Sequence, residues 1–258
     1  MKKYYTRVCN FVYGKSSIKL VNQKKNLPLN GNKQISFSQI EIISRDSRKI
    51  INLKDIKKLS SSLKKKVNKD LKTIIKKNKN FLNLNLEKIP NVMGILNLTP
   101  DSFSDGGKFN KKKEGENHAI SLSKLGADII DVGGESTRPG SKAISSKKEW
   151  ERIEATIKKT SKKILLSLDT RKSEIMEKGI KTGIKIINDI SGLNYDVKTI
   201  NILKKYKTPF VIHHSKGSPE NMQNNPTYKN EILDIYDFFE KKIKFVRSNG
   251  IKHNNIII

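Results

Sequence analysis

The chain has 258 residues, enough for one large domain or for one domain with an appendage. It carries 53 basic and 25 acidic side chains, a net charge of +28, and a single cysteine, Cys9. One cysteine excludes a disulfide framework within the chain and fits a reducing compartment. We find neither a signal peptide nor a membrane span, and we therefore expect a cytoplasmic protein.

The excess of lysine has two explanations, a polyanion-binding surface or a biased composition. Lysines occur along the whole chain, with a denser run at 54–79. No nucleic-acid recognition motif accompanies them. We favour biased composition and do not expect a nucleic-acid partner, although a positive field would help to collect anionic substrates.

Residues 1–90 form the first part of the chain and differ in pattern from the rest. Residues 36–42 alternate between polar and apolar side chains, which predicts a strand. From Asp55 to Ile75, apolar residues recur every three to four positions, which predicts an amphipathic helix with Asp55 as its cap. Residues 81–86 predict another short strand. We expect an N-terminal α+β extension without recognisable chemistry.

Residues 91–258 alternate short apolar runs with helical stretches, a pattern that predicts a parallel sheet or a β/α barrel. The runs are almost entirely apolar, as in parallel strands buried on both faces. They are 92–98, 128–132, 164–168, 185–187, 209–212 and 255–258. Glycines that end helices as left-handed C-caps precede three of the runs: Gly126, Gly183 and Gly250. Ser146 and Glu149 predict a capping box at the start of the helix that contains Trp150.

Polar residues stand at the C-terminal ends of four of these apolar runs, namely Asn97, Asp131, Asp169 and Asn188. In β/α barrels this edge of the sheet carries the active site, and open doubly wound sheets bind ligands there as well. A carboxylate beside a carboxamide can hold a ring that displays alternating donors and acceptors. The alternative is that Asp169 and Asn188 each cap the helix that follows.

Two strand-end loops combine features that suit ligand binding. Residues 97–107 are rich in acceptors, hydroxyls and paired glycines, and could act as a lid. Residues 131–140 add Arg138, whose planar guanidinium can bind a carboxylate or a phosphate. For His213 and His214 we expect packing at the barrel top or substrate contact rather than metal binding, since no carboxylate or cysteine stands at ligand spacing.

Four segments, MGILNLTPDSFSDGG, IIDVGGESTRPGS, SLDTRK and IINDISG, resemble the dihydropteroate synthase family of pterin-binding enzymes in order and spacing. The resemblance covers 91–258 and implies an α/β fold, a TIM-type (β/α)8 barrel preceded by the extension at 1–90. It also implies a transferase of folate biosynthesis, which joins 6-hydroxymethyl-7,8-dihydropterin pyrophosphate to para-aminobenzoate. The products are 7,8-dihydropteroate and pyrophosphate.

The same resemblance assigns roles to individual residues and implies no covalent nucleophile. Asn97 corresponds to a ligand of the magnesium ion that accompanies the pyrophosphate. The substrate-binding residues that it implies are Asp169 and Asn188 for the pterin, Phe103 and Pro139 for the aminobenzoate, and Thr137 with Arg138 in the second loop.

The sequence holds about six of the eight strands that such a barrel needs. The family's later segments, an Asp-Pro-Gly loop, a Ser-Arg-Lys segment and an Arg-x-His pair, do not occur in it. We therefore expect an incomplete barrel that is weakly active or inactive by itself, and a homodimer in the full-length form. The alternatives are a related pterin-binding methyltransferase-type barrel, and an inactive fragment or basic binding protein.

Overall fold

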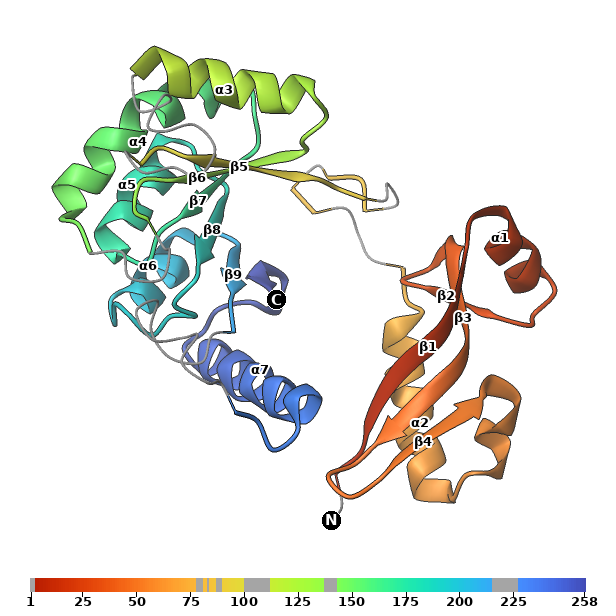
Figure 1. The fold of residues 1–258 in the computed structure, drawn as a ribbon. Coiled ribbons are helices and arrows are strands. Elements are labelled where there is room, and N and C mark those ends of the chain that lie inside the picture. Colours follow the sequence, from red (N-terminus) through yellow and green to blue (C-terminus); the bar gives the residue numbers. More distant parts are fainter. Residues whose placement is uncertain are drawn as a thin grey trace. The chain divides into compact units, whose positions relative to one another are not determined.

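The chain folds into two compact units, Met1–Ile89 and Pro90–Ile258, each with its own core. The computed structural model describes residues 3–77, 81–82, 84–86, 90–99, 112–136, 143–214 and 227–258. Figure 1 shows both units, the first in red to orange and the second in yellow to blue.

The first unit is built around a four-stranded antiparallel sheet. Its long strand β3 (Asn32–Ile43) pairs on one side with β1 (Tyr5–Tyr13). On its other side it pairs with β2 (Leu27–Leu29) and β4 (Arg48–Asn52) in turn. The predicted strand at 36–42 is confirmed as part of β3. Because every pair includes β3, its apolar side chains organise the unit's core.

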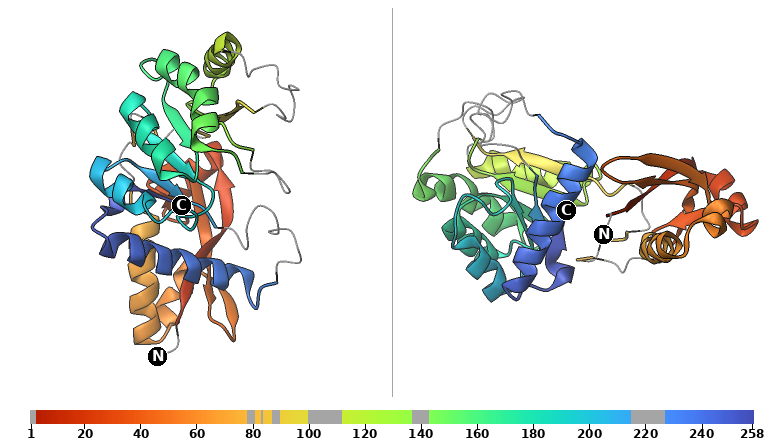
Figure 2. Two further views of the ribbon diagram at one scale, coloured as in Figure 1. Left: turned by 90° about the vertical axis from the view of Figure 1, so that its left-hand side faces the viewer. Right: turned by 90° about the horizontal axis from the view of Figure 1, so that it is seen from below.

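Two helices accompany this sheet, α1 (Gly14–Asn22) and α2 (Ser61–Ile74). The views in Figure 2 show α2 lying along one side of the sheet. Val67 and Leu71 on α2 are buried in one apolar cluster with Phe37 and Ile40 of β3. The hydroxyl of Thr6 on β1 also donates to Asp70 on α2, at 2.7 Å.

The prediction of one helix starting at Asp55 is wrong. Residues Leu53–Lys58 form a 3-10 helix, the chain is extended at Leu59 and Ser60, and α2 begins only at Ser61. Asp55 does not cap α2; its carboxylate pairs with Lys58 at 2.8 Å and accepts from Asn52. The apolar spacing was correct, but periodicity alone does not separate a 3-10 turn from an α-helix when both bury the same side.

The predicted strand at 81–86 is also wrong for the residues that the structure describes there. Phe81 and Leu84 form an isolated antiparallel bridge, and no strand is assigned to the described positions. The two bridged residues are only three apart, so they close a tight turn rather than a ladder.

The second unit is a six-stranded, all-parallel sheet in the order β10-β9-β8-β7-β6-β5. The strands are β5 (Met93–Asn97), β6 (Ile129–Gly133), β7 (Leu166–Asp169), β8 (Ile186–Asp189), β9 (Phe210–Ile212) and β10 (Ile256–Ile257). The helices are α3 (Lys112–Lys124), α4 (Ser146–Thr160), α5 (Ser173–Thr182), α6 (Thr199–Tyr206) and α7 (Glu231–Ser248), with a 3-10 turn η3 (His253–Asn255) before β10. Each predicted apolar run therefore contributes one strand.

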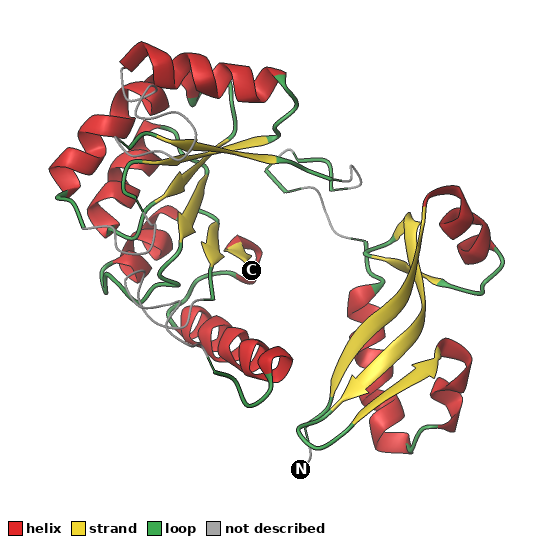
Figure 3. Cartoon of the chain, viewed as in Figure 1, coloured by secondary structure: helices red, strands yellow, loops and turns green. Residues whose placement is uncertain are grey.

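Helices α3 to α6 follow one another along one side of this sheet, as the secondary-structure colours of Figure 3 make plain. Ile153 and Ile157 of α4 are fully buried in the same apolar cluster as Leu166 and Leu168 of β7. Strand–helix units of this kind, wound in one direction with strands in sequential order, are the repeating element of a β/α barrel.

The predicted glycine C-caps are confirmed, because Gly126, Gly183 and Gly250 have φ angles of 108°, 118° and 87°. The capping box is wrong: α4 is capped by Ser145, whose hydroxyl accepts from the amide of Lys148 at 3.3 Å. Glu149 is fully buried instead of reaching back to the cap. In the described parts of the chain, no helix is both long enough and apolar enough to cross a membrane.

The fold makes a stability prediction for α4. Ile157 is fully buried, so Ile157→Ala should lower the free energy of unfolding by about 2–5 kcal/mol through lost apolar contact and a residual cavity. Its neighbour Lys158 pairs with Glu154 at the surface, and Lys158→Ala should change stability by less than about 1 kcal/mol. Urea unfolding followed by circular dichroism measures both; equal midpoints for the two variants would contradict the packing described for α4.

Candidate functional site

Four strand ends lie side by side at one edge of the parallel sheet. In the strand register, Asn97 of β5 is opposite Gly133 of β6, Gly133 is opposite Asp169 of β7, and Asp169 is opposite Asn188 of β8. Directly paired residues in a sheet project to the same face. Three of the polar residues singled out in the sequence thus form one row across four strands, together with a glycine.

Gly133 allows two of these side chains to approach each other. A Cβ atom at Gly133 would lie 3.3 Å from Oδ1 of Asn97 and 3.4 Å from Oδ2 of Asp169. The side chains of Asn97 and Asp169 therefore converge over the space that any other residue would fill. Glycine at such a position permits close approach of polar groups or of a ligand.

Asp131 lies two residues before Gly133 on β6, so its side chain projects to the same face of the sheet as the row. Its Oδ2 accepts a hydrogen bond of 2.9 Å from Nδ2 of Asn188. Asp131 is 6% exposed, while Asp169 and Asn188 are partly buried. The two carboxylates and the carboxamide therefore come from three adjacent strands and share one small region.

The pKa values of Asp131 and Asp169 are both raised, and each carboxylate has one oxygen without a hydrogen-bond partner among the described residues. Burial raises the pKa of Asp131, and hydrogen bonding from Ser167 and Asn188 offsets this only in part. Burial, reinforced by the nearby charge of Asp131, raises the pKa of Asp169 well above its ordinary value. Among the described residues, Oδ1 of Asp131 and Oδ1 of Asp169 are buried without a hydrogen-bond partner. Buried oxygens of this kind can bind the N–H groups of a ligand.

Asn188 and its neighbour Asp189 serve different purposes, because successive strand residues point to opposite faces. Oδ1 of Asp189 accepts from the amide and the hydroxyl of Ser191, at 2.8 and 2.6 Å, and Oδ2 accepts from the amide of Leu193. Asp189 thereby fixes the turn after β8. Neither Asp169 nor Asn188 caps a helix, since Lys172 and Lys198 hold the N-cap positions of α5 and α6.

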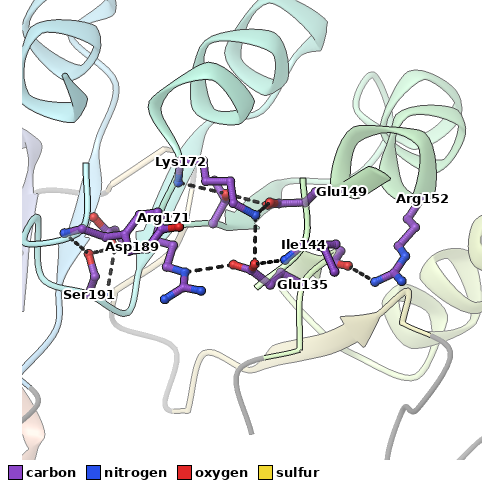
Figure 4. A network of polar contacts seen from close by, with 11 residues as sticks. Glu135, Ile144, Glu149, Arg152, Arg171, Lys172, Asp189 and Ser191 are labelled. Atoms are coloured by element: carbon purple, nitrogen blue, oxygen red, sulfur yellow. Dashed lines mark hydrogen bonds and ion pairs between the residues drawn. The ribbon is translucent and has the colours of Figure 1, made fainter. Parts of the chain in front are cut away.

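Figure 4 shows a buried ion network that includes Glu135, Glu149 and Lys172. The two glutamates are close enough to Asp169 of the polar row for their charges to act on its pKa. The ammonium of Lys172 donates to Oε1 of Glu135 at 2.9 Å and to Oε2 of Glu149 at 2.6 Å. The hydroxyl of Thr170 donates to the other oxygen of Glu149, at 2.6 Å. Glu135 and Thr170 follow β6 and β7, and Glu149 belongs to α4, so the network ties two strand-end loops to one helix.

Glu135 also joins the two ends of the loop between β6 and α4. Its Oε1 accepts from the amide of Ile144 at 3.0 Å, and its Oε2 accepts from Nε of Arg171 at 2.9 Å. Burial by itself would raise the pKa of Glu135, but hydrogen bonds from Arg171, Lys172 and Ile144 lower it below its ordinary value. The guanidinium of Arg171 also lies 4.1 Å from the ring centroid of Tyr195.

The sequence analysis assigned Glu149 to a capping box and did not single out Lys172. One signal was present: Glu149 occupies the same helical stripe as Ile153, Thr156 and Ile157, and all four are buried. A charged residue inside an apolar stripe requires a buried partner. The stripe therefore indicates that Glu149 has a buried partner. It does not indicate that this partner is Lys172, 23 positions away in the chain.

Four predicted site residues, Phe103, Thr137, Arg138 and Pro139, lie outside the described residues, and their roles remain predictions. His214 packs edge-on against Phe238 of α7, with ring centroids 4.8 Å apart, and also lies near Phe239 and Tyr228. His213 is exposed. The predicted packing role thus applies to His214.

Comparison with known proteins identifies the family to which residues 93–258 belong. The family model described as pterin binding enzyme matches residues 93–258, most of the chain. The chain belongs to the pterin-binding enzyme family. A dihydropteroate synthase from Synechocystis is 37% identical over 169 residues, which cover 65% of this chain and 58% of that relative.

Solved structures of the family share the fold. A Yersinia pestis dihydropteroate synthase in complex with a sulfonamide drug is 36% identical, with a TM-score of 0.65 over 69% of this chain and 65% of that one. A Clostridium difficile dihydropteroate synthase with pteroic acid is 40% identical, with a TM-score of 0.56 over 64% and 61%. The second unit is therefore a TIM-type β/α fold with six strands of the barrel. The chain spans about 60% of the length of the curated relatives it matches.

The ion network predicts a large effect of Lys172→Met. This change leaves Glu135 and Glu149 buried without their shared cation, so the free energy of unfolding should fall by about 3–5 kcal/mol. Lys178→Met is the control, because Lys178 pairs with Glu174 at the surface and should matter by less than about 0.5 kcal/mol. Chemical unfolding of both variants decides; a Lys172→Met loss as small as that of the control would refute the network's role.

The raised pKa of Asp169 predicts a pH-dependent effect of Asp169→Asn. The folded state holds the proton more tightly than the unfolded state, so the native carboxyl stabilises at acid pH and loses this contribution as pH rises through its folded pKa. Asp169→Asn should therefore increase stability at neutral pH, with a gain that shrinks toward about pH 4.

Asp196→Asn is the control of opposite sign. Asp196 accepts from the amides of Ser173 and Lys198, and these contacts lower its pKa despite some burial. Its charged form stabilises the fold above the unfolded pKa, so Asp196→Asn should lower stability at neutral pH. Thermal melts between about pH 4 and 8 measure both variants; shifts of the same sign would show that burial does not govern Asp169.

Proposed function

We propose that the protein is a dihydropteroate synthase of folate biosynthesis. In this reaction the amine of para-aminobenzoate displaces pyrophosphate from 6-hydroxymethyl-7,8-dihydropterin pyrophosphate. The observation that carries the proposal is the row formed by Asn97, Gly133, Asp169 and Asn188 at the C-terminal edge of the sheet. Family membership supports it, and so does the Clostridium difficile relative solved in the presence of pteroic acid, since pteroic acid joins a pterin to an aminobenzoate.

The polar row fits the edge of a pterin ring. That edge presents adjacent N–H donors and a carbonyl acceptor, and the row offers carboxylate oxygens of Asp131 and Asp169 with the carboxamide of Asn188. The unpartnered oxygens of the two carboxylates would accept from the ring. Binding would thus remove the electrostatic cost of burying these groups, which strengthens the contact.

The chemistry is a substitution at the methylene carbon attached to the pterin. The carbon–oxygen bond to pyrophosphate breaks, a carbon–nitrogen bond to the aminobenzoate forms, and the amine loses a proton. Positive charge developing on the pterin would be stabilised by the carboxylates of Asp131 and Asp169. The chain's remaining contribution is to hold the two reactants in position, because an aromatic amine is a weak nucleophile.

Magnesium is the cation that the family resemblance implies, and Asn97 is compatible with it. Its Oδ1 is a hard oxygen ligand, and the Asn97 side chain is exposed at the strand end. Within the described residues, no group of three or more His, Cys, Asp or Glu side chains could hold a metal. Magnesium commonly uses few protein ligands together with waters and substrate phosphates. We propose that Asn97 would supply one ligand to this ion, whose positive charge would help to neutralise the leaving pyrophosphate.

A methyltransferase-type barrel that binds methyltetrahydrofolate is the nearest rival, because the same row would hold its pterin. Such a barrel has no pyrophosphate to bind, and it would not need the second loop in this form. Glu135 on one side of that loop accepts from the amide of Ile144 on its other side and from the ammonium of Lys172, so the ion network anchors both sides. This anchoring favours the synthase.

Binding measurements test the proposal without requiring turnover. Isothermal titration of the chain with the dihydropterin pyrophosphate and Mg²⁺ should give saturable binding. Asp169→Ala should weaken it about tenfold to a hundredfold, since a hydrogen bond to a buried charged group is lost. Asn97→Ala should weaken binding only when both Mg²⁺ and the pyrophosphate group are present. Asn201→Ala, an exposed amide on α6, is the control.

Two results would overturn the proposal, and a third would overturn the role given to Asn97. One is failure of the folded chain to bind the dihydropterin pyrophosphate. Another is stronger binding of methyltetrahydrofolate, which would favour the methyltransferase. The third is an equal loss for Asn97→Ala with 6-hydroxymethylpterin, which lacks pyrophosphate; that loss would assign Asn97 to the pterin rather than to the metal.

A further inference from the structure

Arg171 connects three successive loops at the C-terminal edge of the parallel sheet. It follows β7 by two residues, and its Nε donates to Oε2 of Glu135, which follows β6, at 2.9 Å (Figure 4). The carbon of its guanidinium lies 4.1 Å from the ring centroid of Tyr195, in the loop after β8. One side chain therefore contacts the loops on both sides of its own.

The two contacts restrict the guanidinium in different ways. The contact with Glu135 is a hydrogen bond between opposite charges at Nε, whereas the contact with Tyr195 places the guanidinium carbon over an aromatic ring. A planar group that is held at both places has little freedom to rotate. The Arg171 side chain is only 16% exposed, as expected for a side chain with a single orientation.

Tyr195 is anchored to the end of β8. The amides of Asn194 and Tyr195 both donate to the hydroxyl of Ser191, at 3.3 Å. That hydroxyl in turn donates to Oδ1 of Asp189, the last residue of β8, at 2.6 Å. Tyr195 is 48% exposed, so these backbone contacts, more than packing of the ring, fix its place. The ring that Arg171 contacts is thus attached to the strand end that carries the polar row.

The two oxygens of Glu135 have different partners. Oε1 accepts from the ammonium of Lys172 at 2.9 Å and from the amide of Ile144 at 3.0 Å. Among the described residues, Oε2 accepts from Arg171 alone. Lys172 can therefore compensate the charge of Glu135 without Arg171. The orientation of the carboxylate depends on both cations, because each holds a different oxygen, and in that orientation Oε1 meets the amide of Ile144.

We propose that Arg171 is a positioning residue, which together with Tyr195 orients Glu135 and so fixes the two sides of the loop between β6 and α4 for the aminobenzoate. The inference rests on the proposed function, because Pro139 of this loop is an expected contact of the aminobenzoate. Pterin affinity should not depend on Arg171, since the polar row consists of strand residues that are held by the sheet itself.

Amide hydrogen exchange of the full chain, followed by NMR, tests the positioning role without a ligand. Tyr195→Leu removes the ring from a half-exposed site. The amide of Ile144 should then exchange about three to ten times faster, because Glu135 is held less firmly. Arg171→Lys keeps the charge but loses the planar, rigid geometry, so it should have an effect of similar size.

Matched controls separate this local effect from a general loss of stability. Tyr195→Phe keeps the ring and should leave the exchange of Ile144 unchanged. Phe245→Leu removes a ring of similar exposure, 49%, from α7 and should also have no effect there. The amide of Leu233 is an internal reference, because it too donates to a side chain, Oδ1 of Asn230, at 3.1 Å. Its exchange should stay the same in every variant.

Isothermal titration with para-aminobenzoate tests the consequence for binding. The chain is first saturated with 6-hydroxymethylpterin, which lacks the pyrophosphate leaving group and so prevents turnover. Tyr195→Leu and Arg171→Lys should each raise the Kd for the aminobenzoate about threefold to tenfold. Their Kd for 6-hydroxymethylpterin should change by less than about twofold. Tyr195→Phe should bind both ligands as the native chain does.

The outcomes distinguish this proposal from the proposed function. Unchanged exchange of Ile144 in Tyr195→Leu and Arg171→Lys would overturn the positioning role and leave Lys172 to orient Glu135. Equal losses of affinity for both ligands would also overturn it, because they would show a general disturbance of the sheet edge. If the native chain binds the pterin but no aminobenzoate, the positioning role fails while pterin binding stands. Failure to bind any pterin overturns the proposed function instead, and the exchange measurement still decides whether Arg171 orients Glu135.

Discussion

One buried ammonium holds the functional edge of the second unit together. Lys172 lies between Glu135 and Glu149, so a residue after β7 is bound to a residue after β6 and to the first turn of α4. Each carboxylate would be costly to bury alone, and so would the ammonium. Because each group needs the others, the loops after β6 and β7 and the start of α4 cannot move independently. The restraint includes Thr170 and Lys172, which closely follow Asp169 of the polar row.

The neighbouring carboxylates of Asp131 and Asp169 differ from those of Glu135 and Glu149, which pair with Lys172. They lie close to the ion network but receive no cation from it, and the pKa of each is raised, by burial first. Lys172 thus neutralises Glu135 and Glu149, whereas Asp131 and Asp169 each keep one buried oxygen without a hydrogen-bond partner among the described residues. An unsatisfied carboxylate destabilises the free protein, and a ligand that supplies N–H donors recovers that energy on binding. The division between the two pairs is a physical criterion that separates structural acids from ligand-binding ones.

Much of this arrangement follows from the sequence, because it depends on local patterns. Apolar runs fixed the strands to within a residue or two, and the C-cap glycines marked where helices end. Asn97, Asp169 and Asn188 could be placed in one row because parallel strands share a C-terminal edge. Gly133 completes that row, and its role depends on the distance between side chains of two other strands, which no local pattern contains.

The failures share a cause as well. The helix predicted from Asp55 and the capping box at Ser146 were each inferred from a few adjacent residues, while tertiary contacts decided the outcome. At Glu149 the competing partners were a backbone amide nearby and an ammonium on another element. Glu149 is buried, so water does not compete for its carboxylate. In such a site a hydrogen bond between two charged groups is stronger than one between a carboxylate and a backbone amide.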